Sequence, residues 1–150
     1  MLLSKQIAVD INIAGCKLKQ YTATMLKQQN IDLTPEQFLL IDLLWNQGPL
    51  SQQDLADQMQ KDKNSITKLV DAIERKGFVV RQQNPNDRRS NTIILTDLAY
   101  SLRDDAKTKG ISILNRMLDG IPEDELHSFL QTLEKLCSNI TVTDSSRQNR

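Results

Sequence analysis

The chain has 150 residues, of which 39% are hydrophobic and 25% charged, and its formal net charge at pH 7 is +0. That length suits one domain with appended helices and is too short for two independent enzymatic lobes. The balanced charge argues against a protein that coats nucleic acid by overall charge, and no stretch approaches the roughly 18 to 20 apolar residues that span a bilayer.

Two helices are expected in the first third of the chain. The first runs to about Asn30, and its apolar residues recur at intervals of three and four, as in a helix that packs on another helix. The second begins at Thr34, because its hydroxyl can accept an amide hydrogen bond, proline suits the next position, and Gln37 completes a capping box. Gly48 and the proline after it end this helix. The apolar residues of the first helix are Ile7, Ile11, Ala14, Leu18, Tyr21 and Met25, and those of the second are Phe38, Ile41, Leu44 and Trp45.

Two shorter helices joined by a polar turn are expected next. Ser51, with Asp54 three residues later, predicts the start of the third helix, and the turn follows at residues 60–62. The fourth helix has an apolar stripe at positions i, i+3, i+4 and i+7, with Gly77 as its C-terminal cap. The stripe consists of Ile66, Leu69, Val70 and Ile73.

A β-hairpin with a basic tip is expected after the fourth helix. Residues 78–80 and 92–95 are short apolar runs typical of strands, and the polar segment between them contains the turn signal Asn84-Pro85-Asn86-Asp87. Eight basic and four acidic residues lie between Lys61 and Arg89, a local excess of +4, so the rest of the chain sums to −4. Positive charge is therefore concentrated on this wing and on the helix before it.

Two further helices complete the predicted order. Thr96 and Asp97 cap the fifth, in which Gly110 is a weak point. Pro122 and the three acidic residues after it begin the sixth, because the helix dipole stabilises acidic side chains in the first turn. The apolar seam of the sixth helix consists of Leu126, Leu130, Leu133, Cys137 and Ile140.

The order of helix, short helix, helix and basic hairpin is the plan of a winged helix-turn-helix. The expected fold is mainly α with a small β-hairpin. We expect an N-terminal dimerisation helix at residues 1–30, a DNA-binding core at 31–96, C-terminal dimerisation helices at 97–142 and a disordered tail at 143–150. Both ends of the chain carry apolar seams that one winged-helix core is too small to cover, which predicts a homodimer.

The predicted site is the polar face of the fourth helix together with the wing. In a winged helix-turn-helix, the second helix of the motif enters the major groove and the wing lies over the neighbouring minor groove. Short polar and basic side chains hydrogen-bond base edges and phosphates, and guanidinium suits a narrow minor groove. Asp87 can orient one wing arginine through a bidentate pair. The residues expected to contact duplex DNA are Lys63, Asn64, Ser65, Thr67, Lys68, Arg75, Asp87, Arg88 and Arg89.

Several motifs together resemble a known family. In the wing, Arg89 follows Asp87 by two residues, and after five further residues Leu95 and Thr96 open the next helix. Supporting motifs are Leu33-Thr34 with Phe38, Leu50 with Leu55-Ala56, Thr67-Lys68-Leu69-Val70, and Glu74-Arg75-Lys76-Gly77-Phe78-Val79. From about residue 7 to 140 the chain resembles the multiple antibiotic resistance regulator (MarR) family of winged-helix dimers. In many relatives an arginine stands where Lys68 stands here, so the charge is kept but bidentate guanine recognition is weakened.

The resemblance implies a transcription regulator, with repression as the expected outcome. It implies a dimer with intertwined terminal helices and two recognition helices, placed on a pseudo-palindromic operator whose half-sites lie roughly 34 to 36 Å apart. Members of the family often respond to small aromatic ligands, and Tyr21, Met25 and Trp45 could line such a site. Ordinary core packing is the better interpretation of these three residues, so no ligand is assigned to them.

Three other interpretations stay open or are disfavoured. Cys16, with Tyr21 one to two turns later, resembles the peroxide-sensing branch, although a single cysteine on an apolar seam is more often a small buried hydrophobe. A winged-helix adaptor that binds protein is the second alternative, since fold alone does not fix function, but such adaptors usually lose the basic wing. An enzyme is not expected, because His127 has no Ser or Cys partner at a suggestive spacing.

Cysteine usage indicates a cytoplasmic protein without cofactors. Cys16 and Cys137 lie far apart and have no Cys or His neighbours at metal-ligand spacing. Lys5, Gln6 and Asp10 interrupt the apolar residues near the start of the chain, which argues against a signal peptide.

Overall fold

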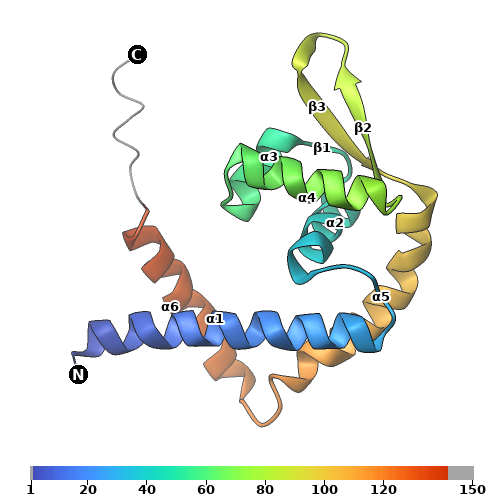
Figure 1. Cartoon of the computed structure of the whole chain (residues 1–150). Helices are drawn as coiled ribbons and strands as arrows, with labels where there is room; N and C mark the ends of the chain where they lie inside the picture. Colours follow the sequence, from blue (N-terminus) through green and yellow to red (C-terminus); the bar gives the residue numbers. More distant parts are fainter. Residues whose placement is uncertain (1, 142–150) are drawn as a thin grey trace, which may run out of the picture. The chain divides into compact units, whose positions relative to one another are not determined.

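The computed structural model describes residues 2–141, apart from the side chains of Arg88 and Arg89. The disordered tail expected at residues 143–150 therefore lies outside the described residues. The chain divides into two units, Met1–Gly110 and Ile111–Arg150. The described residues form six helices and three short strands (Figure 1). In chain order these are α1 (Leu3–Gln28), α2 (Pro35–Gln47), β1 (Leu50–Ser51), α3 (Gln52–Met59), α4 (Lys63–Arg75), β2 (Val79–Asn84), β3 (Asp87–Leu95), α5 (Asp97–Arg116) and α6 (Glu123–Asn139).

Side-chain caps fix the starts of α2 and α3, as predicted. The Thr34 hydroxyl accepts a hydrogen bond from the Gln37 backbone N–H at 3.2 Å, and the Gln37 side chain accepts one from the Thr34 N–H at 3.1 Å. Ser51 and Asp54 make the same reciprocal pair at 3.0 and 3.3 Å. The predicted capping box at Thr34 and the predicted start of α3 at Ser51 are confirmed. Each reciprocal pair satisfies backbone donors that the first helical turn would otherwise leave unpaired.

The end of α4 turns the chain into the wing. Gly77 has a φ of 86°, in the left-handed region that favours glycine. Its N–H donates to the Glu74 carbonyl, and the Phe78 N–H donates to the Ile73 carbonyl, both at 3.0 Å. These two bonds form a Schellman motif, which confirms the predicted cap and sets the direction in which β2 leaves the helix.

The hydrophobic core of the first unit lies between α2, α3, α4 and the sheet. Its largest fully buried side chains are Leu40, Ile41, Leu44, Leu55, Ile66, Val70, Ile73, Val79 and Ile93. Three of the four residues in the predicted α4 stripe are in this list, and Leu69 is partly buried. Trp45 is also buried, and its indole N–H donates to the Ala99 carbonyl at 3.1 Å, which ties the start of α5 to α2.

The sheet is longer and has one more strand than the sequence predicts. Its order is β1-β3-β2, all antiparallel, with Leu50 opposite Ile93 and Asn84 opposite Asp87. Residues 82–91 were expected to connect two short strands, and this was wrong: the strands continue through that segment and leave only a two-residue turn. A ladder of backbone hydrogen bonds does not require apolar side chains, so hydrophobicity alone ended the predicted strands too early.

Helices α5 and α6 begin where the sequence predicts. The Thr96 hydroxyl donates to the Gly77 carbonyl at 2.6 Å, and α5 starts at the next residue. The helix continues through Gly110, the last residue of the first unit. Three acidic residues occupy the first turn of α6. None of the described helices combines the length and the apolar character needed to cross a membrane.

Large apolar side chains lie exposed on the terminal helices of a single chain. On α6, Phe129 is 61% exposed and Leu130 60% exposed. On α1, Ile7, Ile11 and Leu18 are exposed as well. The chain by itself therefore leaves apolar surface on both helices in contact with water.

Candidate nucleic-acid interface

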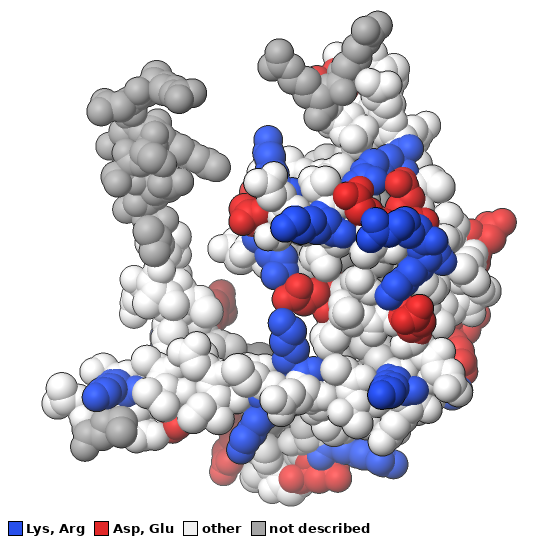
Figure 2. Space-filling model, in the orientation of Figure 1, with Lys and Arg blue, Asp and Glu red and all other residues white. Residues whose placement is uncertain are grey.

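Helix α4 presents a polar face opposite its buried stripe. Lys63, Asn64, Thr67 and Lys68 are exposed there, and Ser65 is half-buried. Arg75 is exposed at the C-terminal end of the same helix. Figure 2 shows lysine and arginine side chains gathered over the part of the first unit that holds α4, with acidic side chains among them. The acidic neighbours decide how much of this positive charge is available to a ligand.

Asp62, which lies in the segment predicted from the sequence to be a polar turn, caps the N-terminus of α4. The Ser65 N–H donates to Asp62 Oδ1 at 2.7 Å. This backbone hydrogen bond, followed by one from the Ser65 side chain, lowers the pKa of the Asp62 carboxyl. Asp62 therefore stays ionised at neutral pH and places a negative charge at the start of the helix that was expected to approach DNA. Aspartate is a preferred N-cap residue, so its position immediately before the helix could have predicted this cap.

The Thr67 hydroxyl is engaged within the protein. It donates to the Lys63 carbonyl at 2.9 Å and accepts from the Gln52 side-chain amide at 3.2 Å. The hydroxyl proton of Thr67 is therefore already donated within the protein. A ligand can still contact the Thr67 methyl group and one lone pair of its hydroxyl oxygen.

Arg81, one of the eight bases between Lys61 and Arg89, forms the most extensive polar contacts near α4 among the described residues. Its guanidinium donates to Asp71 Oδ1 at 2.6 Å and to Glu74 Oε1 at 3.0 Å, both on α4. It also donates to the side-chain oxygen of Gln52 and to the Thr67 carbonyl, each at 3.4 Å. The positive charge of Arg81 is thus offset by two carboxylates of α4.

Ion pairs reduce the basic excess in this region to a few residues. Lys61 pairs with Glu36 at 3.2 Å, and Lys76 pairs with Asp32 at 3.6 Å. Within the part of the chain that the structure describes, three exposed bases of α4 have no carboxylate oxygen within 4.0 Å. These are Lys63, Lys68 and Arg75.

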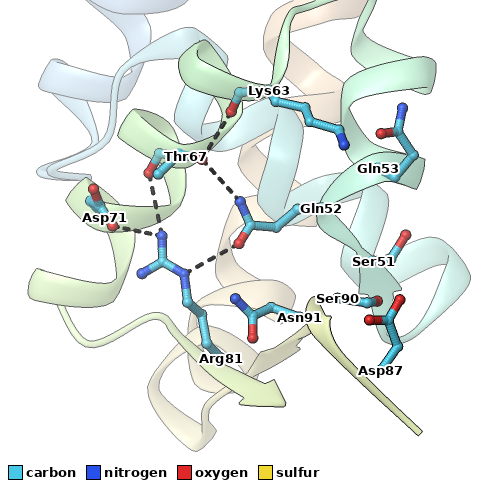
Figure 3. A pocket seen from close by; sticks show the side chains of 10 residues that line it. All are labelled: Ser51, Gln52, Gln53, Lys63, Thr67, Asp71, Arg81, Asp87, Ser90 and Asn91. Carbon is cyan, nitrogen blue, oxygen red and sulfur yellow. Dashed lines mark hydrogen bonds and ion pairs between the residues drawn. The ribbon is translucent and has the colours of Figure 1, made fainter. Parts of the chain in front are cut away.

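A polar groove separates α4 from the wing (Figure 3). It has a volume of about 810 Å³ and combines the start of α3, the exposed side of α4 and the two wing strands. Its lining residues are Ser51, Gln52, Gln53, Lys63, Thr67, Asp71, Arg81, Asp87, Ser90 and Asn91. Of the predicted DNA contacts, the groove brings together Lys63, Thr67 and Asp87, whereas Asn64, Ser65, Lys68 and Arg75 lie outside its lining. The backbones of Arg88 and Arg89 belong to β3, and their side chains lie outside what the structure describes.

The tryptophan, the two cysteines and the histidine discussed in the sequence lie outside the groove lining. Trp45 is a core residue in edge-to-face contact with Phe38 at 5.7 Å between ring centroids. Cys16 and Cys137 are both exposed in the single chain, so the burial expected of a cysteine on an apolar seam is not found there. His127 is exposed, with Glu123 at 3.5 Å. Among the described residues no group of His, Cys, Asp and Glu could hold a metal ion.

Glu36 joins three segments of the first unit through two lysines. Its Oε1 accepts from Lys19 on α1 and from Lys61 before α4, each at 3.2 Å. The Lys19 hydrogen bond, and next the Lys61 hydrogen bond, lower the pKa of the Glu36 carboxyl from its ordinary value of 4.5.

Glu36→Gln is expected to lower the free energy of unfolding at pH 7 by about 0.2 to 1 kcal/mol, the range for solvent-exposed ion pairs. Because the pKa is lowered by folding, this contribution is fully present above pH 4.5 and is lost as the pH falls through the lowered value. Urea titrations at several pH values check the prediction, with Asp119→Asn as a control at an exposed acid. A difference that persisted at a pH low enough to protonate the carboxyls of the folded protein would contradict the ionic explanation.

Comparison with known proteins relates this arrangement to one family. The model of the MarR family matches residues 33–91, from the residue before the α2 cap to the middle of β3. The matched region contains α2, α3, α4, β2 and the groove-lining residues.

Individual relatives extend the similarity over more of the chain. The uncharacterized HTH-type transcriptional regulator YkoM of Bacillus subtilis (strain 168) is 30% identical over 101 residues, which cover 67% of this chain and 66% of YkoM. A MarR-family transcriptional regulator from Rhodococcus sp. RHA1, solved by X-ray crystallography, has a TM-score of 0.77 and 28% identity, over 91% of this chain and 95% of that one. CouR from Rhodococcus jostii RHA1, solved bound to p-coumaroyl-CoA, has a TM-score of 0.77 and 26% identity, over 95% and 99% of the two chains.

Proposed function

Because the chain belongs to the MarR family of transcription regulators, we propose that it binds duplex DNA as a homodimer and represses transcription from a pseudo-palindromic operator. The observation that carries the proposal is the exposed face of α4, where Lys63 and Lys68 have no carboxylate oxygen within 4.0 Å among the described residues. This face lies beside a groove whose other wall is the wing. Positive charge next to short polar side chains on one helix is the combination that DNA recognition requires.

The part of the DNA that each residue is proposed to contact follows from the chemistry of its side chain. Asn64 and Ser65, in the first turn of α4, contact base edges in the major groove, and the Thr67 methyl group contacts a thymine methyl. Lys63, Lys68 and Arg75 contact phosphates. In the wing, Arg88 and Arg89 enter the minor groove, with Asp87 as their orienting carboxylate.

The proposed homodimer uses the exposed apolar faces of the terminal helices. Residues 1–30 and 97–142 supply dimerisation helices, and residues 31–96 supply the DNA-binding core. A symmetric second copy would cover Phe129 and Leu130 on α6 and Ile7 on α1, which a single chain leaves exposed. The two α4 helices would then meet half-sites roughly 34 to 36 Å apart.

An aromatic effector that changes DNA affinity is also proposed. The supporting observation is the structural similarity to CouR, which binds p-coumaroyl-CoA.

We further propose that the chain acts in the cytoplasm and catalyses no reaction, as for a family of transcription regulators.

The proposal is tested by selecting bound sequences from random duplex DNA and measuring their affinity. We expect an inverted repeat with half-sites one helical turn apart. Adding phenolic acids and their thioesters to the complex then searches for the effector, and adding peroxide to the wild type and to Cys16→Ser tests the redox alternative. Failure of the wild type to prefer any duplex would refute the regulator and favour a protein-binding adaptor.

The double variant Arg88→Ala with Arg89→Ala is expected to bind the selected operator more weakly and with a reduced salt dependence. Each lost phosphate contact lowers the slope of log K against log salt by about 0.9, so four lost contacts in a dimer lower it by up to about 3.6. Fluorescence anisotropy at several salt concentrations measures the slope. The double variant Lys107→Ala with Lys109→Ala removes the same charge from the exposed side of α5 and serves as the control. An unchanged slope in the wing variant would show that the wing makes no phosphate contact.

A further inference from the structure

Arg81 lies at the junction of three elements that the proposed DNA contacts depend on. It is the third residue of β2, where the wing leaves the core. Its guanidinium meets Asp71 and Glu74 on α4 and the Gln52 side chain at the start of α3 (Figure 3 shows the Asp71 and Gln52 contacts). One side chain therefore joins the wing to both helices of the helix-turn-helix.

These contacts fix the orientation of the Arg81 side chain more firmly than a single surface ion pair would. The planar guanidinium donates in two directions, to Asp71 Oδ1 at 2.6 Å and to Glu74 Oε1 at 3.0 Å. The second oxygen of Glu74 accepts from the Arg81 backbone N–H at 3.3 Å, so Glu74 holds both the side chain and the main chain of the strand. The Arg81 side chain is only 21% exposed. A partly desolvated network of this kind fixes an orientation better than a single exposed pair does.

The position of Arg81 along β2 determines what its contacts can hold. Val79, two residues earlier, is buried in the core, whereas the side chains of Gln82 and Gln83 are exposed. Arg81 therefore lies between the part of the strand that the core fixes and the part that extends toward the wing tip. The second link, from Gln52 to the Thr67 hydroxyl, attaches the same network to the middle of the exposed α4 face.

We propose that Arg81 is a positioning residue for DNA binding: it fixes the wing relative to α4, so that both bind the duplex as one preorganised unit. It does this without contacting DNA itself, because four of the five N–H groups of its guanidinium donate to Asp71, Glu74, Gln52 and the Thr67 carbonyl. Loss of the network leaves the contacts of each element intact but adds the cost of ordering the wing when DNA binds. The inference rests on the proposed DNA-binding function.

The decisive variant removes the network without changing the net charge. Arg81→Gln alone leaves two uncompensated carboxylates beside the DNA-binding face, and their repulsion of phosphate would lower affinity for a trivial reason. Asp71→Asn combined with Arg81→Gln keeps the wild-type charge. We expect this double variant to bind the operator about 10-fold to 100-fold more weakly, with the salt slope of the wild type. The matched control is Asp105→Asn with Lys109→Gln, which removes an ion pair on α5 at constant charge and should leave affinity unchanged.

Hydrogen exchange of the free protein separates positioning from overall stability. In the charge-matched variant, amides of β2 and β3 should exchange faster, while those of the core residues Leu40, Ile41 and Ile66 should keep their wild-type protection. Faster exchange throughout the first unit would assign Arg81 a merely stabilising role and overturn the proposal. A salt slope reduced by about 0.9 per subunit would overturn it too, because it would show that Arg81 contacts phosphate.

The test also distinguishes failure of this inference from failure of the proposed function. If the wild type binds an operator and the charge-matched variant binds it equally well, the positioning role is refuted while the regulator stands. If the wild type binds no duplex, the proposed function is refuted. The exchange measurement needs no DNA, so unchanged exchange in β2 and β3 would still refute the role of Arg81 in holding the wing.

Discussion

Leu130→Lys is expected to dissociate the proposed homodimer and to lower operator affinity by more than a hundredfold. Leu130 lies on α6 and is 60% exposed in a single chain, so it is a central candidate for the surface that a second copy covers. Burying one leucine contributes about 1.5 to 3 kcal/mol, and a two-fold symmetric interface buries it twice, giving about 3 to 6 kcal/mol. Since about 1.4 kcal/mol corresponds to a factor of ten, the dimer dissociation constant should rise by two to four orders of magnitude.

Weaker DNA binding follows from dissociation because one subunit can occupy only one half-site. In a dimer, binding of the first α4 holds the second at a high effective concentration over the other half-site, and a monomer loses this advantage. The operator affinity of Leu130→Lys should therefore recover in part at protein concentrations high enough to restore the dimer. This dependence on concentration distinguishes lost dimerisation from damage to the DNA-binding face.

Analytical ultracentrifugation measures the dissociation constant, and circular dichroism checks that the variant is folded. Gln131→Lys is the matched control, since it places the same charge on the next residue of α6, which is polar and exposed. We expect Gln131→Lys to stay dimeric. A dimeric Leu130→Lys with wild-type affinity would show that the apolar face of α6 is not part of the dimer interface.

Features of the fold that depend on neighbouring residues could be predicted from the sequence. Thr34 with Gln37 and Ser51 with Asp54 make capping boxes because the bonded groups are three residues apart. Gly77 takes a left-handed conformation that few other residues tolerate, so its place after an apolar stripe predicted the end of α4. Local signals of this kind were sufficient to predict the order of the helices and the winged helix-turn-helix.

Features that depend on contacts between distant segments could not be predicted in the same way. Strand β1 has only two residues, and it is a strand because it pairs with β3 some forty residues later along the chain. Arg81 added to the positive excess when charges were counted, yet its partners lie seven, ten and twenty-nine residues away. A count of charges cannot show which bases are already paired, and it therefore overestimated the charge available for DNA on this face.

Two variants of Lys68 are expected to distinguish a contact to phosphate from a contact to a base in the proposed interface. Lys68 is exposed on α4 and has no carboxylate within 4.0 Å among the described residues, so its ammonium group can reach a phosphate or a base. Lys68→Ala should lower the salt slope by about 1.8, that is, about 0.9 for one lost phosphate contact in each of two subunits. Lys68→Arg should keep the slope.

The arginine variant should instead gain base discrimination, because a guanidinium can donate to the O6 and N7 atoms of one guanine together, and an ammonium group cannot match this planar geometry. A good bidentate pair is worth about 1 to 3 kcal/mol, so operators with guanine at the contacted position of both half-sites should gain about 2 to 6 kcal/mol over operators without it. Parallel selections with the wild type and Lys68→Arg measure this preference, and Lys107→Arg is the control on α5. Equal base preferences in the two selections would place Lys68 against the DNA backbone, and an unchanged slope in Lys68→Ala would place it away from DNA altogether.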